Sequence, residues 1–211
     1  MYKIYVLFLI FFFVCFAIVS ASEKSLNGKI IYIDPGHGGV DPGATYKDIY
    51  EDVINLEFSK VLKEGLEKVG AKVYMTRYGD YDLSSTTYHR KRSDLGNRAV
   101  MINNSDCDLY LSIHLNSSVH SSWNGAQVFY DDINEKNGEL AKSIQIELND
   151  KQVVLNNEYY MYSRIKKPGV LIELGFISNS NDRNNLLNNE YRKKISAKII
   201  EGVSNFLNNI K

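Results

Sequence analysis

The sequence has very little cysteine. Of its 211 residues only Cys15 and Cys107 are cysteines, and Cys15 lies within an apolar N-terminal segment without the preceding small residues typical of a lipoprotein. The rest of the chain has a single cysteine, which excludes an internal disulfide, so a core or a metal must stabilise it. We expect Cys107 to be a small buried hydrophobic residue and not a catalytic thiol.

The sequence also lacks an excess of charge of either sign and any internal repeat. Lys and Arg number 25, as do Asp and Glu. Without a basic excess, nothing indicates nucleic-acid binding, and a partner must be recognised by a specific site. Hydrophobic residues make up 44% and charged residues 24%, which is ordinary for a folded protein. The length is that of one domain, with or without an appendage.

The N-terminus departs from this average composition. In "MYKIYVLFLIFFFVCFAIVSA" one lysine precedes an uninterrupted apolar run, and small residues end the segment. This pattern predicts a secretory signal peptide over residues 1–21. The run is nearly long enough to span a bilayer, so an uncleaved membrane anchor is the alternative. Either reading predicts an exported, extracytoplasmic protein whose N-terminal segment engages the membrane.

After a short polar linker expected at 22–28, strand-like and helix-like segments alternate through 29–211. Apolar runs predict strands, and apolar residues at helical spacing predict helices. The alternation predicts a single α/β domain, with a mostly parallel twisted sheet and helices on both faces. Polar connections at 77–94 and 115–125 are expected at the surface. The expected strands are 29–34, 71–76, 108–115, 126–130 and 168–174, and the expected helices are 52–69, 95–103, 138–148, 182–187 and 190–207.

Candidate polar residues follow three of the expected strands. His37 follows the first strand in "IDPGHGG", His114 ends "DLYLSIHL", and Glu173 lies in "GVLIELGF". Because ligands bind beyond the carboxyl ends of parallel strands, we expect these side chains to gather at one edge. Glu51, which opens the first helix, can face the same edge.

This group suits zinc hydrolysis. A catalytic zinc takes three protein ligands and keeps a position open for water, and a further carboxylate is then needed to move the proton. His37, Glu51 and His114 would be the ligands and Glu173 the proton carrier. The spacing alone leaves the alternative open, because no His-x-x-x-His or Cys-x-x-Cys pair is present and a lone histidine is more often structural.

Four sequence blocks carry a resemblance to a known family. The blocks "IDPGHGGVDPGA", "YEDVINLEFSKVL", "LYLSIHLNSS" and "KPGVLIELGFISNSND" resemble, in this order, the zinc-dependent N-acetylmuramoyl-L-alanine amidases of the amidase-3 family. The resemblance extends from about Lys29 to the C-terminus. It implies that His37, Glu51 and His114 bind Zn2+ and that Glu173 is catalytic. The segment "ATYKDIYE" departs from the family pattern by its lack of glycine, so Glu57 is kept as an alternative to Glu51.

Several other polar residues are expected to have supporting roles. Asp34 and Asp41 are expected to shape the turn rather than to bind metal, with Asp34 a candidate to support a ligand. Asn116 is a candidate substrate contact. Arg98 is expected in an ion pair on a helix surface, with a substrate clamp as the alternative. Other expectations concern His89 and His120, which should be solvated, and the tyrosines of 155–162, which should pack in the core and at its edge.

The resemblance also implies a biological role. It is to the germination-specific, spore-cortex amidases of endospore-forming bacteria, which implies hydrolysis of the lactyl–L-alanine amide of peptidoglycan during formation of muramic-δ-lactam, with an accessory sporulation lipoprotein as a partner. The alternatives are a general cell-division or autolytic amidase, a zinc peptidase that cleaves within the stem peptide, and a non-catalytic peptidoglycan-binding module.

Overall fold

The computed structural model describes residues 26–148, 153–156 and 158–209. The segment 1–21, predicted to be a signal peptide or anchor, lies outside the described residues. No helix within those ranges combines the length and apolar character needed to cross a bilayer. The end of the expected linker belongs to the fold, because Leu26 is buried and its N–H donates to the Val69 carbonyl.

The centre of the molecule is one mixed, mostly parallel sheet. The strand order is β4-β1-β5-β8-β6-β7, in which the first four strands are parallel. The prediction of a mostly parallel sheet is therefore confirmed. The exceptions are β6, which runs antiparallel to β8, and β7, which is parallel to β6. The strands are β1 (Ile30–Pro35), β4 (Lys72–Met75), β5 (Leu109–Asn116), β6 (Gln127–Tyr130), β7 (Val154–Leu155) and β8 (Gly169–Phe176).

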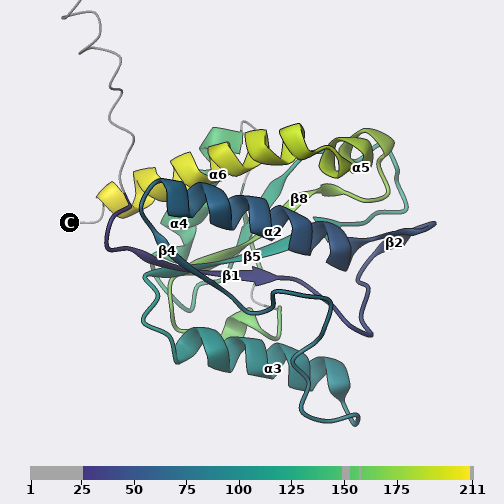
Figure 1. Cartoon of the computed structure of the whole chain (residues 1–211), viewed down its shortest axis with the longest axis horizontal. Helices are drawn as coiled ribbons and strands as arrows, with labels where there is room; N and C mark the ends of the chain where they lie inside the picture. The colour runs from purple at the N-terminus through teal and green to yellow at the C-terminus, as the bar shows by residue number, and fades with distance from the viewer. Residues whose placement is uncertain (1–25, 149–152, 157, 210–211) are drawn as a thin grey trace, which may run out of the picture.

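Helices cover both faces of this sheet (Figure 1), as predicted. On one face lie α2 (Glu51–Lys68), α4 (Asn137–Leu148) and α6 (Asn189–Asn209), and on the other lies α3 (Arg90–Asn103). A short helix, α5 (Ser180–Leu187), precedes α6, and a single 3-10 turn, η1 (Tyr162–Arg164), lies on the α3 side. Helix α2 buries the apolar stripe that its sequence predicts, formed by Ile54, Phe58, Leu62 and Leu66.

Two local features near the carboxyl edge of the sheet differ from the expectation. Helix α3 begins at Arg90, five residues before the expected Leu95. The sequence did not predict this first turn, because "RKRSD" is polar and carries no apolar periodicity. The segment before α2 forms a small hairpin of β2 (Thr45–Tyr46) and β3 (Ile49–Tyr50). This hairpin returns the chain so that α2 begins beside the turn that follows β1.

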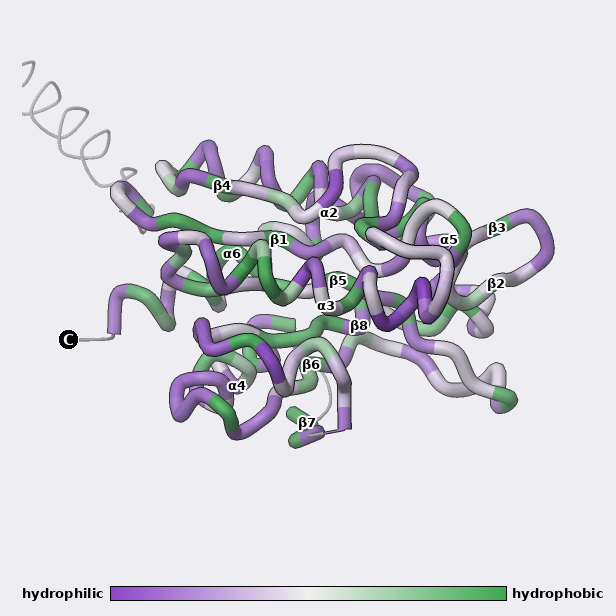
Figure 2. Tube along the Cα trace, turned by 90° about the horizontal axis from the view of Figure 1, so that it is seen from below, coloured by the Kyte–Doolittle hydropathy of each residue, from purple (hydrophilic) through white to green (hydrophobic). Residues whose placement is uncertain are grey.

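Alternation along the strands separates two cores. In β5, Leu109, Leu111 and Ile113 face the core beneath α2, α4 and α6, whereas Tyr110 belongs to the smaller core beneath α3 and η1. The central strands are largely hydrophobic (Figure 2). His114 has the same parity as Tyr110, so its side chain points to the α3 face at the carboxyl end of the strand. Cys107 is buried in this smaller core, as predicted.

Candidate metal and catalytic site

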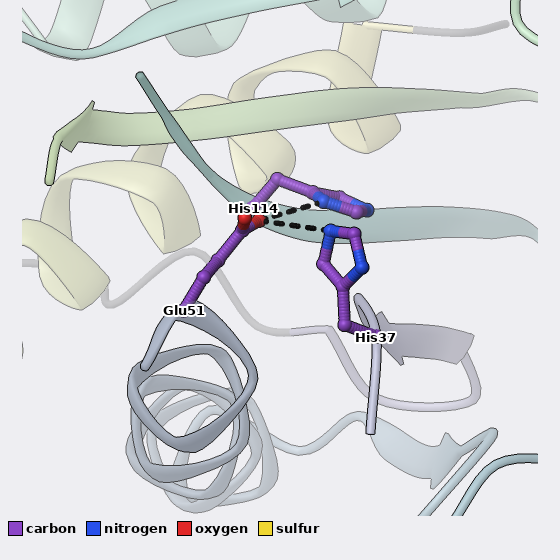
Figure 3. Close-up of side chains that lie close together, drawn as sticks. All are labelled: His37, Glu51 and His114. Atoms are coloured by element: carbon purple, nitrogen blue, oxygen red, sulfur yellow. Dashed lines mark hydrogen bonds and ion pairs between the residues drawn. The ribbon is translucent and has the colours of Figure 1, made fainter. Parts of the chain in front are cut away.

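Three of the predicted residues converge at the carboxyl edge of the sheet. His37 comes from the turn after β1, His114 from β5 and Glu51 from the first residue of α2 (Figure 3). The Oε1 atom of Glu51 lies 3.3 Å from Nε2 of His37 and 3.0 Å from Nδ1 of His114. One potential ligand atom from each residue lies within 4.8 Å of the others. Their assignment as metal ligands remains a prediction.

The glycines of "IDPGHGG" make room for this convergence. A Cβ atom on Gly36 would lie 2.2 Å from Cε1 of His114, so only a glycine lets the imidazole rest on this backbone. His37 itself has a φ of 62°, which is uncommon for a residue with a side chain. On the opposite side, a Cβ on Gly43 would lie 2.5 Å from Oε2 of Glu51. The turn is therefore shaped around the two histidines and the glutamate.

Glu51 is held as a buried carboxylate. It is 3% exposed, and it accepts hydrogen bonds from the backbone N–H groups of Ala44 at 2.7 Å and Leu115 at 3.0 Å. The amide of Asn55 adds a third donor at 3.2 Å. Burial opposes ionisation, but hydrogen bonds from His114 and His37 outweigh it and hold the pKa of Glu51 far below its ordinary value. The site therefore has a fixed negative charge at its centre.

The hydrogen bonds of His37 leave one ring nitrogen facing that charge. Its Nδ1 lies 3.0 Å from Oδ2 of Asp41, which as a carboxylate can only accept, so Nδ1 carries the proton and Nε2 points toward Glu51. Burial lowers the pKa of His37, but its bonds to Glu51 and Asp41 outweigh burial and raise that pKa. Two imidazole nitrogens and one carboxylate oxygen facing a common point are the donor set that zinc prefers, and the residues present fit that metal.

Glu173 lies beside this cluster on the neighbouring strand. It is in register with His114 across the β5–β8 pair and is 7% exposed. Its Oε2 atom is buried and has no hydrogen-bond partner among the described residues. Burial, with the charge of Glu51 as a second cause, raises the pKa of Glu173 to about 8. A carboxyl group that gains and loses its proton near neutrality can serve as a general acid and base.

The ion pair predicted for Arg98 is present, but it is buried and does not lie on the helix surface as expected. Arg98 is 1% exposed and pairs at 2.9 Å with both Asp34 and Asp94. It also donates to the carbonyl oxygens of Pro35 and His37, so it fixes the turn that follows β1. The sequence contained a signal for this burial, because position 98 falls on the apolar stripe that Leu95, Ala99 and Ile102 define.

Arg77 corrects a second expectation. The connection 77–94 was expected at the surface, but Arg77 at its start is fully buried and donates to the carbonyl oxygens of Pro35, Gly36 and Asp52. Asp34 shapes the site by accepting from Arg98, and Thr76 donates to the same carboxylate at 2.6 Å. Two buried guanidinium groups thus donate to backbone carbonyl oxygens in and beside the turn that follows β1.

The cluster lies on the floor of a cleft of about 270 Å³. Asn116 lines this cleft, as do the tyrosines 159, 160 and 162 from the segment that was expected only to pack. Tyr162 is buried, and its hydroxyl oxygen lies 3.5 Å from Nε2 of His114. His89 and His120 are exposed, as predicted. Glu57 pairs with Lys60 on the surface of α2 and does not belong to the cluster.

Comparison with known proteins identifies relatives of this chain. The family model described as N-acetylmuramoyl-L-alanine amidase (Amidase_3) matches residues 31–205. The germination-specific N-acetylmuramoyl-L-alanine amidase of Bacillus subtilis (strain 168) is 38% identical over 188 residues, which cover 84% of this chain and 79% of that protein. The probable cell wall amidase LytH of Staphylococcus saprophyticus is 35% identical over 190 residues, which cover 86% of this chain and 60% of that protein.

A solved structure has the same fold. The CwlD amidase from Clostridioides difficile, determined in complex with the GerS lipoprotein, matches with a TM-score of 0.81 and 35% sequence identity. The match covers 86% of this chain and 99% of that one.

Proposed function

The chain belongs to the Amidase_3 family of N-acetylmuramoyl-L-alanine amidases, and we propose that it hydrolyses, with zinc, the amide bond between the lactyl group of N-acetylmuramic acid and L-alanine in peptidoglycan. One observation carries this proposal. The side chains of His37, Glu51 and His114 point at one another on the floor of a cleft, next to a buried carboxyl group on Glu173.

His37, Glu51 and His114 would hold the zinc. When bound there, zinc polarises a carbonyl oxygen and lowers the pKa of a coordinated water. Glu173 takes the proton of the attacking water and gives it to the nitrogen of L-alanine as the amide breaks. A cation held by the three ligands would lower the pKa of Glu173 and so make its carboxylate form available at neutral pH. Asn116 lines the cleft and is the candidate contact with the substrate.

We propose that the biological substrate is the spore cortex, where removal of the stem peptide is the step that prepares muramic-δ-lactam. The similarity to a germination-specific amidase supports this role. Similarity to a probable cell wall amidase keeps a general cell-wall role as the second candidate. Because the related CwlD amidase was solved with a lipoprotein, we propose an accessory lipoprotein as a partner. The protein acts outside the cytoplasm, and residues 1–21 direct its export as a signal peptide or an anchor.

Mass spectrometry of digested peptidoglycan tests the reaction. Purified sacculi and purified cortex are each incubated with the zinc-loaded protein, and the products are separated and weighed. The proposal predicts intact stem peptides that begin with L-alanine, together with glycan strands that carry free lactyl groups. Shortened stems that remain on the glycan would instead show a zinc peptidase, and binding without release would show a non-catalytic peptidoglycan-binding module.

A comparison of the two substrates tests the role. Faster release from cortex than from vegetative sacculi is expected for a spore enzyme, whereas equal or slower release would favour the cell-division or autolytic role.

A further inference from the structure

Tyr162 connects a buried polar chain to the imidazole of His114. Its hydroxyl group donates to Oγ of Ser112 at 2.9 Å, and its oxygen lies 3.5 Å from Nε2 of His114. Ser112 in turn donates to Oδ2 of Asp34 at 2.8 Å. Asp34, Ser112 and Tyr162 are all buried, so these hydrogen bonds are shielded from solvent.

The charge of Asp34 sets the direction of every hydrogen bond in this chain. The carboxyl group is buried, which opposes ionisation, but the guanidinium of Arg98 outweighs burial and lowers the pKa of Asp34. As a carboxylate it only accepts, so the Ser112 hydroxyl must use its single proton on Asp34. The Ser112 oxygen then accepts the hydrogen bond that the Tyr162 hydroxyl donates. The Tyr162 oxygen is left with lone pairs alone facing His114.

We propose that Tyr162 is a positioning residue for the zinc-loaded protein. There it would keep the proton of His114 on Nε2 and leave the Nδ1 lone pair for the metal, which would replace the Nδ1 proton that faces Glu51 in the metal-free protein. A lone-pair oxygen beside Nε2 favours an N–H group there, which leaves Nδ1 as the nitrogen directed at Glu51, 3.0 Å away. Asp41 does the same for His37 from the other side. This inference rests on the proposed zinc site, because it states which nitrogen of His114 binds the metal and what keeps that nitrogen available.

The packing around both rings makes this position rigid. The His114 ring lies against the backbone of Gly36, where a Cβ would come within 2.2 Å of it. The Tyr162 ring is stacked on Tyr110 at a centroid distance of 6.2 Å and meets Tyr159 edge-on at 5.4 Å. Neither ring can turn away without displacing a neighbour. The hydroxyl of Tyr162 is therefore a fixed acceptor and not a mobile one.

Zinc affinity measured by competition with a chelating dye tests the inference. Tyr162→Phe removes only the hydroxyl, and we expect it to weaken zinc binding by about 10- to 100-fold. Ser112→Ala is expected to weaken binding as well, although its side chain is farther from the metal, because the Tyr162 proton is then free to turn toward Nε2. Tyr110→Phe is the matched control: it removes a hydroxyl from the stacked ring in the same core, and no hydrogen bond in the described structure joins that hydroxyl to His114.

Nuclear magnetic resonance of the zinc-loaded, ¹⁵N-histidine-labelled protein supplies the second measurement. The wild-type chain and Tyr110→Phe should show metal-bound Nδ1 and a slowly exchanging Nε2 proton on His114. In Tyr162→Phe that proton should exchange faster with solvent. Metal bound through Nε2 would overturn the inference, as would zinc affinity and proton exchange that are the same in all variants. A wild-type chain that takes up no zinc would overturn the proposed function itself, so the two failures are distinguishable.

Discussion

Oε1 of Glu51 lies 3.0 Å from Nδ1 of His114, although the two residues are 63 positions apart in the sequence. The same oxygen accepts the N–H of Leu115, the residue after His114. The first residue of α2 is therefore tied to both the side chain and the backbone at the end of β5. Because Glu51 also faces His37, the packing of α2 on the sheet sets the geometry of the whole cluster.

Glu173→Gln should abolish turnover and leave the metal bound. The amide keeps the size of the side chain but cannot carry a proton between water and the leaving nitrogen. We expect release of stem peptides from sacculi to fall by about 100- to 10,000-fold, with zinc content by elemental analysis equal to that of the wild type. Stem release at the wild-type rate would exclude Glu173 as the proton carrier, whereas loss of zinc would show that it has a different role.

His37→Ala should remove zinc. This variant lacks one of the three proposed ligands, so we expect zinc affinity to fall by more than about 100-fold, beyond the effect of losing a residue that only supports a ligand. His89→Ala is the control, since His89 is exposed and lies outside the cluster. Full zinc occupancy of the His37→Ala protein after dialysis against metal-free buffer would remove His37 from the ligand set.

The pKa of Glu173 predicts a pH dependence of stability in the metal-free protein. The unfolded carboxyl group loses its proton near pH ~4.3, whereas burial keeps the folded group protonated up to about pH 8. Between these values the unfolded state binds fewer protons, so the free energy of unfolding falls as pH rises, by at most ~1.4 kcal/mol per pH unit. Urea denaturation from about pH 5 to about pH 7 should show the free energy of unfolding of the wild type falling relative to that of Glu173→Gln as pH rises. Parallel curves would contradict the raised pKa.

Gly36→Ala should disrupt the site without straining the backbone. Gly36 does not have a positive φ, so alanine is allowed there, but its Cβ would meet the His114 ring at 2.2 Å. We expect the ring to move and zinc affinity to fall by about 10-fold or more. Gly96→Ala is the control, because nothing lies within 4 Å of the added carbon, and alanine in α3 should raise stability by about 1 kcal/mol. Unchanged zinc affinity in Gly36→Ala would show that the turn adjusts freely.

Arg98→Ala should destabilise the fold. The change leaves Asp34 as a buried carboxylate without its guanidinium and removes the donor to the His37 carbonyl, whereas the Pro35 carbonyl keeps its hydrogen bond from Arg77. We expect a loss of about 3–5 kcal/mol in the free energy of unfolding, measured by urea denaturation. Arg92→Ala, which removes an exposed arginine from the same helix, should cost less than about 1 kcal/mol. Similar losses in the two variants would contradict the structural role of Arg98.

Much of the fold could be read from local patterns. The alternation of strands and helices follows from apolar periodicity, and the bounds of α2 and β5 differ by one residue from those expected. The convergence of His37, His114 and Glu173 at one edge followed once the strands were taken as parallel. The direction of β6 could not be read in this way, because a short apolar run has the same pattern whether it pairs in parallel or antiparallel fashion.

The sequence by itself determined which side chains stand at the ends of the strands, because the position of each strand follows from the apolar pattern of neighbouring residues. Only the tertiary structure decided that Arg98 is buried against Asp34, that the hairpin before α2 brings Glu51 to His114, and that Tyr162 is more than a packing residue. These contacts join segments about 50 or more positions apart. The energy of a buried charge or hydrogen bond depends on the partner it meets, and for these residues folding alone supplies that partner.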